Sequence, residues 1–449
     1  MLFDTIVAKT TANGISAINI IRVSGVEAFS IVSKIFKGNN LEKAESHTIK
    51  YGHIHDNGNL IDEVMVFLFR APKSFTTEDV IEISTHGGNF IANKVIKLLI
   101  KNGARLAENG EFTKRAYLNG RLDLTEAESI MDIVEAKTSN QLSLANKQLR
   151  GDVHKLIDEL QGKILDIIAN IEVNIDYPEY DDVEQLTSEI IVPTINVLLK
   201  QIKHILKEAE TGQIIRDGIK TVIVGKPNVG KSSLLNSLLK EDKAIVTNIS
   251  GTTRDLIEAE LNLEGIVLKL IDTAGIRETI DVVEKIGIDR TIKAIEKASL
   301  VLLVLDQSNH LTHLDETLLN LTKDKIRILI GNKIDLGMKI DLEHENIINI
   351  SAKNNTGIDQ LAKEVKSLFI DEKIINEDYA VLSNTRHIGK LEETKQALED
   401  SLKACDDSMP VDMVEIDLRK AWSSLGEITG QSTSENLITT LFSKFCLGK

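Results

Sequence analysis

The segment Gly225-Lys-Pro-Asn-Val-Gly230-Lys231-Ser232 has the residue types and spacing that hold a chain of phosphates. It fits G-x-x-x-x-G-K-[ST], follows the apolar run Thr221–Val224 and precedes a predicted helix over Ser233–Leu239, which is the context that this motif requires. Glycines let backbone N–H groups approach phosphate oxygens, and a helix N-terminus adds partial positive charge. We therefore expect Lys231 to reach the β- and γ-phosphates of a nucleotide and Ser232 to ligate Mg²⁺.

Three further motifs, each after a predicted strand, extend this nucleotide site. In Asp272-Thr273-Ala274-Gly275, the carboxylate can hold Mg²⁺ through water and the Gly275 N–H can meet the γ-phosphate. Asn332-Lys333-Ile334-Asp335 resembles the guanine-binding motif of GTPases, in which the carboxylate accepts from guanine N1 and N2. Adenine lacks that donor pair, so GTP is favoured over ATP. Ser351-Ala352-Lys353 resembles the remaining base-contact loop of GTPases.

The catalytic part of the site departs from the Ras pattern. Gly251–Asp255 lies where a switch segment belongs, and Thr253 is the better candidate for a second Mg²⁺ ligand. Ras-like GTPases orient the attacking water with a Gln after the Asp-x-x-Gly motif, but this chain has Ile276, which cannot polarise water. The amide oxygen of Asn228 could instead hold a monovalent cation that neutralises transition-state charge. A simple turn-stabilising role for Asn228 stays open.

The elements that must position these motifs alternate between strands and helices over residues 214–378, which predicts an open parallel sheet. The predicted strands are Thr221–Val224, Val267–Ile271, Leu300–Leu305, Ile326–Ile330 and Ile347–Ile350.

Residues 1–120 predict an α+β domain. Asn57-Gly58 joins two strand patterns as a hairpin turn, and a helix is expected over Phe90–Lys101. Apolar residues recur every three or four positions from Leu149 to Ile171 and again after Val192, which predicts long helices within 121–213. Helical patterns return over 379–449. The fold class is thus α/β and α+β multidomain, with a P-loop domain inserted in a helical domain.

Composition limits the classes of function. The chain has 449 residues, and 53 Lys and Arg against 68 Asp and Glu give a net charge of -15, which counts against strong non-specific binding of nucleic acid by this chain alone. Its two cysteines cannot form a disulfide framework, which indicates a reducing compartment. The sequence shows no signal peptide or membrane-length apolar run, so we expect a soluble, cytoplasmic protein.

Taken together, the motifs resemble the MnmE (TrmE) family of tRNA-modification GTPases over the whole length. The resembling segments are Gly225–Ser233, Gly251–Asp255, Asp272–Glu278, Asp4–Ala8, Glu111–Ala116 and Phe445–Lys449. The resemblance implies a folate-binding-like N-terminal domain, a helical domain and an inserted Ras-like GTPase domain.

This resemblance also implies a reaction. With an FAD-containing partner of the MnmG (GidA) type, the family forms a 5-carboxymethylaminomethyl or aminomethyl group on the wobble uridine, position 34, of certain tRNAs. A tetrahydrofolate derivative, in its 5-formyl or methylene form, supplies the one-carbon unit. Hydrolysis of GTP is stimulated by K⁺. The implied assembly is a homodimer that forms a heterotetramer with the partner.

The resemblance assigns roles to single residues. The implied K⁺ ligands are Asn228, Thr247, Ile249 and Thr252, and the implied Mg²⁺ ligands are Ser232 and Thr253. Glu284 is the implied group that positions the attacking water, and Cys446 is implied to act in modification. The implied folate contacts are Arg22, Glu82, Arg121 and Lys449. The full set of expected GTP contacts is Asn228, Val229, Gly230, Lys231, Ser232, Ser233, Thr247, Asn248, Ile249, Ser250, Gly251, Thr252, Thr253, Asp272, Thr273, Ala274, Gly275, Asn332, Lys333, Asp335, Ser351, Ala352 and Lys353.

The sequence also leaves other functions to be considered. An Era-like ribosome-assembly switch would carry a basic RNA-binding domain after its GTPase domain, whereas this chain carries acidic helices and the tail Cys446–Lys449. A folate-sensing module that only recruits a partner is a third possibility. For Cys446, a small buried thiol without chemistry is the plain alternative. Lys114 and Arg115 are expected on a solvated face rather than in a binding patch.

Overall fold

The computed structural model describes residues 4–176, 187–240, 244–245, 257–271, 284–342, 345–369, 381–431 and 433–449. Internal contacts divide the chain into two compact units. Unit 1 comprises residues 1–131, 149–161 and 423–449, and unit 2 comprises residues 132–148 and 162–422. Each unit is described by itself.

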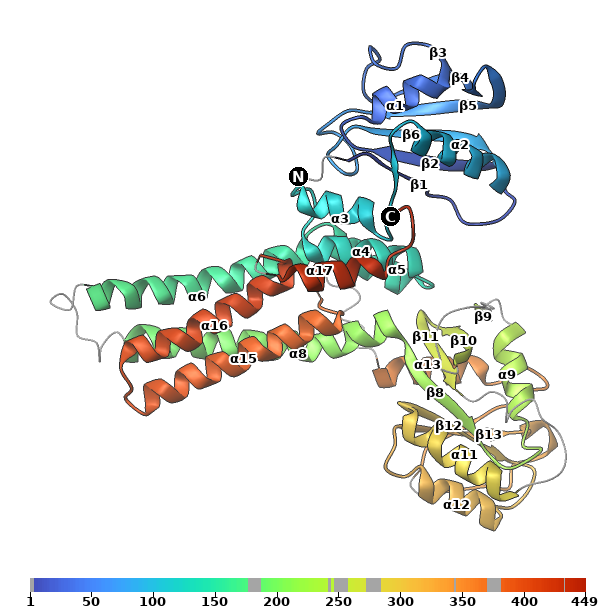
Figure 1. Ribbon diagram of the computed structural model, residues 1–449. Helices are drawn as coiled ribbons and strands as arrows, with labels where there is room; N and C mark the ends of the chain where they lie inside the picture. Colours follow the sequence, from blue (N-terminus) through green and yellow to red (C-terminus); the bar gives the residue numbers. More distant parts are fainter. Residues whose placement is uncertain are drawn as a thin grey trace. The chain divides into compact units, whose positions relative to one another are not determined.

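Unit 1 is built on a seven-stranded mixed sheet in the order β3-β4-β5-β6-β2-β1-β7 (Figure 1). The strands are β1 (Ile6–Lys9), β2 (Ile18–Ser24), β3 (Phe36–Gly38), β4 (Thr48–Asp56), β5 (Asn59–Phe69), β6 (Val80–His86) and β7 (Arg105–Leu106). The predicted hairpin is confirmed: Asn57 and Gly58 have φ of 49° and 88° and join β4 to β5. Helices α1 (Ala28–Ile35) and α2 (Asn89–Lys101) pack their buried residues on one face of the sheet.

The last segment of the chain folds back onto unit 1. Helix α17 (Glu435–Ser443) packs Phe442 against Leu124 of α4 (Leu124–Glu135), and Phe445 joins the same apolar cluster. Backbone hydrogen bonds then tie the tail to helix α3 (Glu111–Leu118): the Gly110 N–H donates to the Cys446 carbonyl and the Phe112 N–H to the Lys449 carbonyl. The tail thereby supplies acceptors for N–H groups at the start of α3 that lack partners within the helix.

The prediction that Arg115 lies on a solvated face is wrong, because only 1% of its side chain is exposed. Its guanidinium donates to carboxylates from three separate segments, at 2.7 Å to Asp4, 3.1 Å to Glu78 and 3.0 Å to Glu111. Burial raises the pKa of Glu111, but hydrogen bonds from Arg105, the Glu108 N–H and Arg115 outweigh it and leave that pKa below its usual value. The ion network joins the segment before β1, the segment before β6 and α3. Lys114 is half-buried.

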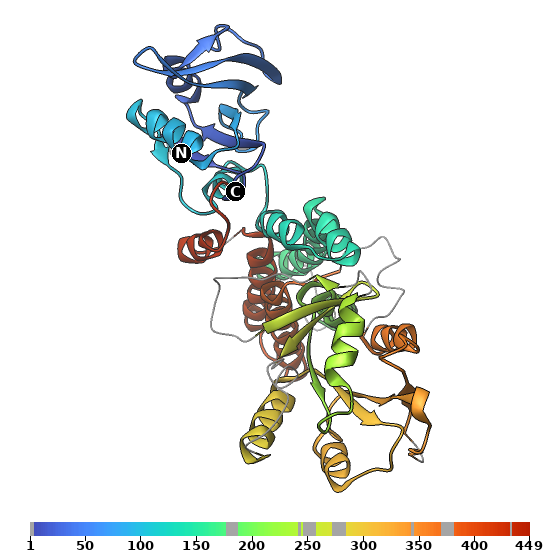
Figure 2. The ribbon, with the colours of Figure 1, turned by 90° about the vertical axis from the view of Figure 1, so that its right-hand side faces the viewer.

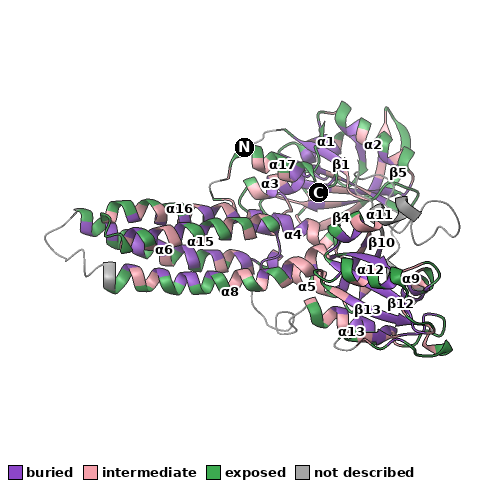
Figure 3. Cartoon of the chain, turned by 90° about the horizontal axis from the view of Figure 1, so that it is seen from below, coloured by how far each residue is buried: buried purple, intermediate pink, exposed green. Residues whose placement is uncertain are grey.

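Long helices dominate the remainder of the chain, as the apolar periodicity predicts. They are α5 (Ser139–Leu149), α6 (Asp152–Asp176), α8 (Val192–Asp217), α15 (Thr385–Asp406) and α16 (Val411–Thr429). In unit 2, α15 lies along α8, and the buried residues of the helices face inward (Figures 1 and 3). One detail differs: Leu149 ends α5 rather than continuing into α6, because the chain turns at Arg150-Gly151.

The second sheet lies in unit 2 and has the order β14-β13-β12-β8-β11-β10-β9 (Figures 1 and 2). Its strands are β8 (Ile219–Val224), β9 (Ala244–Ile245), β10 (Ile257–Leu263), β11 (Ile266–Ile271), β12 (Leu300–Asp306), β13 (Arg327–Asn332) and β14 (Ile347–Asn349). All five predicted strands are present and parallel, and two strands that were not predicted, β10 and β9, extend the sheet with antiparallel pairing. Strand β10 runs antiparallel to β11, because Glu264 and Gly265 form a two-residue turn with φ of 50° and 87°.

Helices cover both faces of this sheet. Buried residues of α9 (Lys231–Lys240) and α13 (Ile358–Phe369) pack on one face, and those of α11 (Glu284–Lys297) and α12 (His313–Leu321) on the other. Strand β12 is buried at every residue, as expected for a central strand covered on both sides. This doubly wound sheet, together with the sheet of unit 1 and the helices, confirms the predicted α/β and α+β multidomain fold. None of the helices among the described residues has the length and apolar content that crossing a bilayer requires.

The ion network predicts a large loss of stability when Arg115 is removed. Arg115→Met leaves three carboxylates without their shared cation, two of them mostly buried, and breaking a buried pair in this way costs about 3–5 kcal/mol. Pulsed hydrogen–deuterium exchange in increasing urea, followed on peptides of β1, β2 and β6, measures this loss. Lys114→Met, at the neighbouring position, is the control and is expected to change unfolding by less than about 1 kcal/mol. Equal effects of the two substitutions would contradict this role for Arg115.

Candidate functional site

The phosphate-binding loop lies between β8 and α9, as its motif requires. The Lys231 ammonium donates to the carbonyls of Gly225 at 2.8 Å and Lys226 at 2.9 Å, so the loop curls around this side chain. Burial lowers the pKa of Lys231. Ser232 and Ser233 lie at the start of α9. Lys231 is the first residue of α9, so its cation lies at a helix N-terminus, where an anion is stabilised.

Asn332, the last residue of β13, links three parts of the nucleotide site. Its side-chain amide donates to the Val229 carbonyl in the phosphate-binding loop at 2.8 Å, and its oxygen accepts from the Ala352 N–H at 3.0 Å. Only 3% of Asn332 is exposed, so each of these bonds is shielded from water. A Cβ on Gly230 would lie 2.3 Å from the Asn332 amide nitrogen, which explains why glycine is needed at that motif position.

Lys333 adds an electrostatic link beside Asn332. Its ammonium donates to the Asn228 carbonyl at 2.6 Å and to the carboxylate of Asp306, at the end of β12, at 2.8 Å. Burial raises the pKa of Asp306, but the hydrogen bonds from Lys333 and Ser308 outweigh it and lower the pKa to about 2. Asp306 is therefore charged at neutral pH, and the ion pair fixes Lys333 against the phosphate-binding loop.

The two predicted base-contact motifs also meet. The Ser351 hydroxyl donates to the Asp335 carboxylate at 2.7 Å, and Asp335 is exposed.

A further ion pair that holds the phosphate-binding loop was not predicted: Lys226 forms an ion pair of 2.7 Å with Asp315, which is buried at the start of α12. The sequence does hold a signal for it, because Thr312 and Asp315 have the spacing of a capping box.

Some predicted nucleotide contacts lie outside the described residues. They are Thr247, Asn248, Ile249, Ser250, Gly251, Thr252, Thr253, Asp272, Thr273, Ala274 and Gly275. Glu284 is described only as the first residue of α11. The described contacts (Asn228, Val229, Gly230, Lys231, Ser232, Ser233, Asn332, Lys333, Asp335, Ser351, Ala352 and Lys353) occupy the segments after β8, β13 and β14. Because these strands are parallel, their carboxyl ends lie at one edge of the sheet, where α/β sheets bind ligands.

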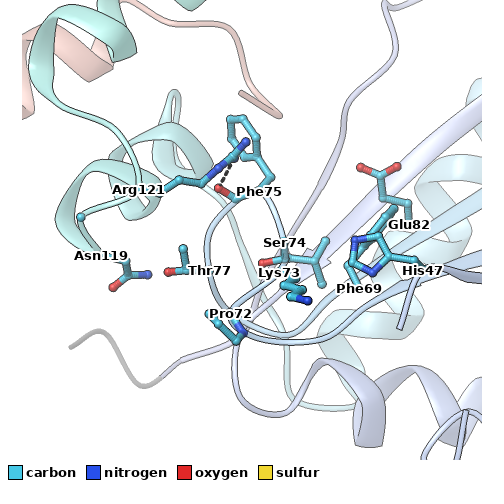
Figure 4. Close-up of a pocket in the computed structure, with 12 residues that line it drawn as sticks. His47, Phe69, Pro72, Lys73, Ser74, Phe75, Thr77, Glu82, Asn119 and Arg121 are labelled. Atoms are coloured by element: carbon cyan, nitrogen blue, oxygen red, sulfur yellow. Dashed lines mark hydrogen bonds between the residues drawn. The ribbon is translucent and has the colours of Figure 1, made fainter. Parts of the chain in front are cut away.

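A second candidate site is a cavity of about 670 Å³ within unit 1 (Figure 4). Its lining residues are His47, Phe69, Pro72, Lys73, Ser74, Phe75, Thr77, Val80, Glu82, Asn119, Gly120 and Arg121. Two of the four predicted folate contacts, Glu82 and Arg121, are among them. In Figure 4, Arg121 lies beside Phe75, and Glu82 and His47 lie together on another side of the cavity.

The other two predicted folate contacts lie next to this cavity. Arg22 forms an ion pair of 2.8 Å with Glu82 across neighbouring strands, and its guanidinium lies over the Phe75 ring. The Lys449 carbonyl accepts from the Phe112 N–H, and the Arg22 guanidinium lies over the Phe112 ring, so the tail ends beside Arg22. Burial lowers the pKa of Lys449, and the charge of Arg22 lowers it further. Burial and the charge of Arg22 likewise lower the pKa of Arg121. Three cations and one carboxylate therefore converge in a chain whose overall charge is -15.

Cys446 is exposed, so the plain alternative of a small buried thiol is wrong. Its carbonyl accepts from the Gly110 and Lys449 N–H groups, and Gly448 lies so close to β1 that a Cβ there would be 2.6 Å from the Lys9 carbonyl. Sequence reasoning did not predict this packing or a role for Phe75, because no motif marks them, and it gave Phe112 no role of its own within Glu111–Ala116. The tail's backbone holds Cys446 in place and leaves its thiol accessible.

The fold and the strand-end motifs define this chain as a P-loop GTPase with added α+β and helical segments. Comparisons with known proteins specify the family. The sequence model of the N-terminus of GTP-binding protein TrmE matches residues 5–121, and that of the MnmE helical domain matches residues 124–446.

Relatives extend this match over the whole chain. The tRNA modification GTPase MnmE of Streptococcus thermophilus (strain CNRZ 1066) is 51% identical over 450 residues, covering 100% of this chain and 99% of that protein. MnmE of Acholeplasma laidlawii is 53% identical over 450 residues, covering 100% of both. Among solved structures, a point variant of Aquifex aeolicus Era bound to GDP and AlF4⁻ is 26% identical over 40% of this chain and 66% of its own, with a TM-score of 0.26. The chain belongs to the MnmE (TrmE) family of tRNA-modification GTPases and is a GTP hydrolase.

The double role of Asn332 predicts a loss of nucleotide affinity on substitution. Asn332→Ala leaves the Val229 carbonyl and the Ala352 N–H without these partners, and leaving a buried polar group unpaired costs about 1–3 kcal/mol. The dissociation constant for a fluorescent GTP analogue should therefore rise roughly 5- to 150-fold. The control is Asn320→Ala, at an exposed position on α12, which should bind as the unmodified protein does. Unchanged affinity of a folded Asn332→Ala protein would contradict the proposed linkage.

Proposed function

We propose that this chain is a K⁺-dependent GTPase that, together with an FAD-containing partner, forms the 5-carboxymethylaminomethyl or aminomethyl group on the wobble uridine of certain tRNAs. The observation that carries the proposal is that Arg22 and Arg121 lie over the Phe75 ring, that Arg22 pairs with Glu82, and that Lys449, from the far end of the sequence, is bonded through its backbone to the neighbouring Phe112. A site with excess positive charge favours an anionic ligand, and reduced folates carry carboxylates. The name of the family's curated relatives, tRNA modification GTPase, supports the substrate.

In the nucleotide site, each residue has its own role in GTP hydrolysis. Lys231 would stabilise charge on the transferring phosphoryl group, and Ser232 with Thr253 would hold Mg²⁺, which would neutralise further phosphate charge. Asn228, Thr247, Ile249 and Thr252 form the K⁺ site. Glu284 positions the attacking water, which Ile276 cannot do. Asp335 accepts from guanine, and its bond from Ser351 orients the carboxylate.

On the folate side, each residue type has a role that its chemistry allows. Glu82 accepts from N–H groups of the ring system, while Arg22, Arg121 and Lys449 bind acceptor oxygens and carboxylates. A 5-formyl or methylene tetrahydrofolate supplies the one-carbon unit when it is bound. Cys446 lies on the same tail as Lys449, with an accessible thiol that can take part in modification.

Four domain segments and an assembly complete the proposal. Residues 1–120 form the folate-binding and dimerisation domain, 121–213 and 379–449 form the helical domain, and 214–378 form the GTPase domain. The chain acts as a homodimer and in a heterotetramer with the MnmG-type partner, in the cytoplasm. Its net charge of -15 supports an assembly in which the partner contributes much of the affinity for tRNA.

The proposed K⁺ site predicts a specific loss of activity in Asn228→Gly. Asn228 has a φ of 63°, a conformation that glycine adopts freely, so this substitution removes the side chain without straining the loop. We expect GTP hydrolysis in KCl to fall at least about tenfold, to the rate in NaCl, because the charge that the cation neutralises in the transition state is no longer offset. Affinity for GTP should stay within about threefold.

Asn57→Gly is the matched control, since Asn57 also has a positive φ, of 49°, but lies in the hairpin turn of unit 1. It should retain full stimulation by K⁺. Potassium stimulation that persists in Asn228→Gly, or that is absent from the unmodified protein, would refute the proposed cation site.

A further inference from the structure

Phe75 is the one aromatic ring, among the described residues, that lies under two guanidinium groups. The Cζ atom of Arg121 is 4.9 Å from the centre of this ring, and that of Arg22 is 5.1 Å away. In addition, the Phe75 carbonyl accepts a hydrogen bond of 2.6 Å from Arg121 (Figure 4). Arg22 also contacts the Phe112 ring, at 5.5 Å, but Arg121 has no such second ring among these contacts.

Hydrogen bonds hold the residues on both sides of Phe75, and on the N-terminal side the Ser74 hydroxyl donates to the Glu78 carbonyl at 2.6 Å. The Asn119 side chain donates to the Thr76 carbonyl at 2.7 Å, and the hydroxyl groups of Ser24 and Thr76 share a hydrogen bond of 2.6 Å. The ring itself packs on a small buried cluster that contains Ile6 and Phe112. The position of the Phe75 ring is therefore set by its own packing and by the hydrogen bonds of its segment, and not by the two arginines.

The charges above this ring repel one another. Burial disfavours the charged form of Arg121, and the proximity of Arg22 disfavours it further, which together lower its pKa. Glu82 pairs with Arg22, whereas the Arg121 guanidinium donates to the Phe75 carbonyl and lies near the charge of Glu126. The face of an aromatic ring carries partial negative charge, so it attracts guanidinium groups that lie over it. Phe75 thus offsets part of the repulsion that would otherwise drive the two arginines apart.

We propose that Phe75 is a positioning residue, which holds Arg22 next to Arg121, a residue of the cavity wall, so that both guanidinium groups can bind one anionic ligand. The arginines, not Phe75, supply the hydrogen bonds to that ligand. This inference rests on the proposed function, in which the cavity of unit 1 binds a reduced folate. It adds that the aromatic face at position 75, rather than apolar volume alone, sets the affinity.

The experiment is isothermal titration calorimetry, in which the full chain is titrated with 5-formyltetrahydrofolate. Phe75→Leu and Phe75→Met keep an apolar side chain but remove the aromatic face, and each should raise the dissociation constant about tenfold, as expected for the loss of two partly exposed cation–π contacts. Phe75→Tyr keeps the aromatic face and should stay within about threefold of the unmodified protein.

A matched control removes a cation–π contact elsewhere in the same unit. Arg70 lies 3.8 Å from the centre of the Phe29 ring, and neither residue lines the cavity. Phe29→Leu should bind the folate as the unmodified protein does. Melting temperature and GTPase rate are measured for every variant, so that a folding defect is separated from a change at the cavity.

Each outcome has a defined meaning. Weak binding by the Leu and Met variants, with normal binding by Phe75→Tyr and Phe29→Leu, supports the inference. Equal binding by the unmodified protein and the Leu and Met variants overturns it and leaves the folate site standing. Loss of binding in Phe75→Tyr as well, at an unchanged melting temperature, also overturns it, because the aromatic face is retained there. Failure of the unmodified protein to bind 5-formyltetrahydrofolate overturns the proposed function itself.

Discussion

The side chain of Asn332 is the contact on which the geometry of the nucleotide site depends. A single amide at the end of β13 donates to the phosphate-binding loop after β8 and accepts from the loop after β14. It can do so only because β8, β12, β13 and β14 run parallel and end at the same edge of the sheet. The close approach of Gly230 and the contact of Lys333 with the Asn228 carbonyl follow from the same arrangement. The motif residue thus supports the site's structure, besides its expected contact with the nucleotide.

Unit 1 depends on a comparable constraint, the buried guanidinium of Arg115. Because it joins Asp4, Glu78 and Glu111, it fixes the start of α3 against the sheet and orders the segment before β6. The start of α3 carries the N–H groups that donate to the carbonyls of the tail residues Cys446 and Lys449. The segment before β6 carries Phe75, which contacts Arg22 and Arg121. The segments that carry the cavity's cations are therefore positioned by an ion network whose central guanidinium, Arg115, is buried.

Local signals in the sequence predicted much of this structure. The phosphate-binding motif, the Asn57-Gly58 turn and the buried run Leu300–Leu305 each depend on neighbouring residues, and each took the predicted form. The antiparallel strand β10 was missed because Glu264-Gly265 is a weaker hairpin signal than Asn-Gly, although both residues adopt positive φ.

Long-range contacts could not be predicted in the same way. Arg115 has charged neighbours in the sequence, and its burial arises from carboxylates at positions 4 and 78 that only the tertiary fold brings together. The same is true of Phe75, since an isolated aromatic residue in a loop has no pattern that indicates a guanidinium partner. The cluster of Arg22, Glu82, Arg121 and Lys449 was assigned from family resemblance, and the fold supplies a physical reason for it in the shared ring and the paired charges.

The central claim, that GTP hydrolysis and a folate-linked site in one chain serve wobble-uridine modification, is tested most directly by mass spectrometry of tRNA nucleosides. Cells that lack this chain are compared with the same cells complemented by the unmodified protein or by Cys446→Ser, a substitution that preserves the tail's backbone contacts. The account predicts that 5-carboxymethylaminomethyl and aminomethyl uridines disappear without the chain and return with the unmodified protein but not with Cys446→Ser. Wobble uridines that remain fully modified in cells without the chain would contradict it.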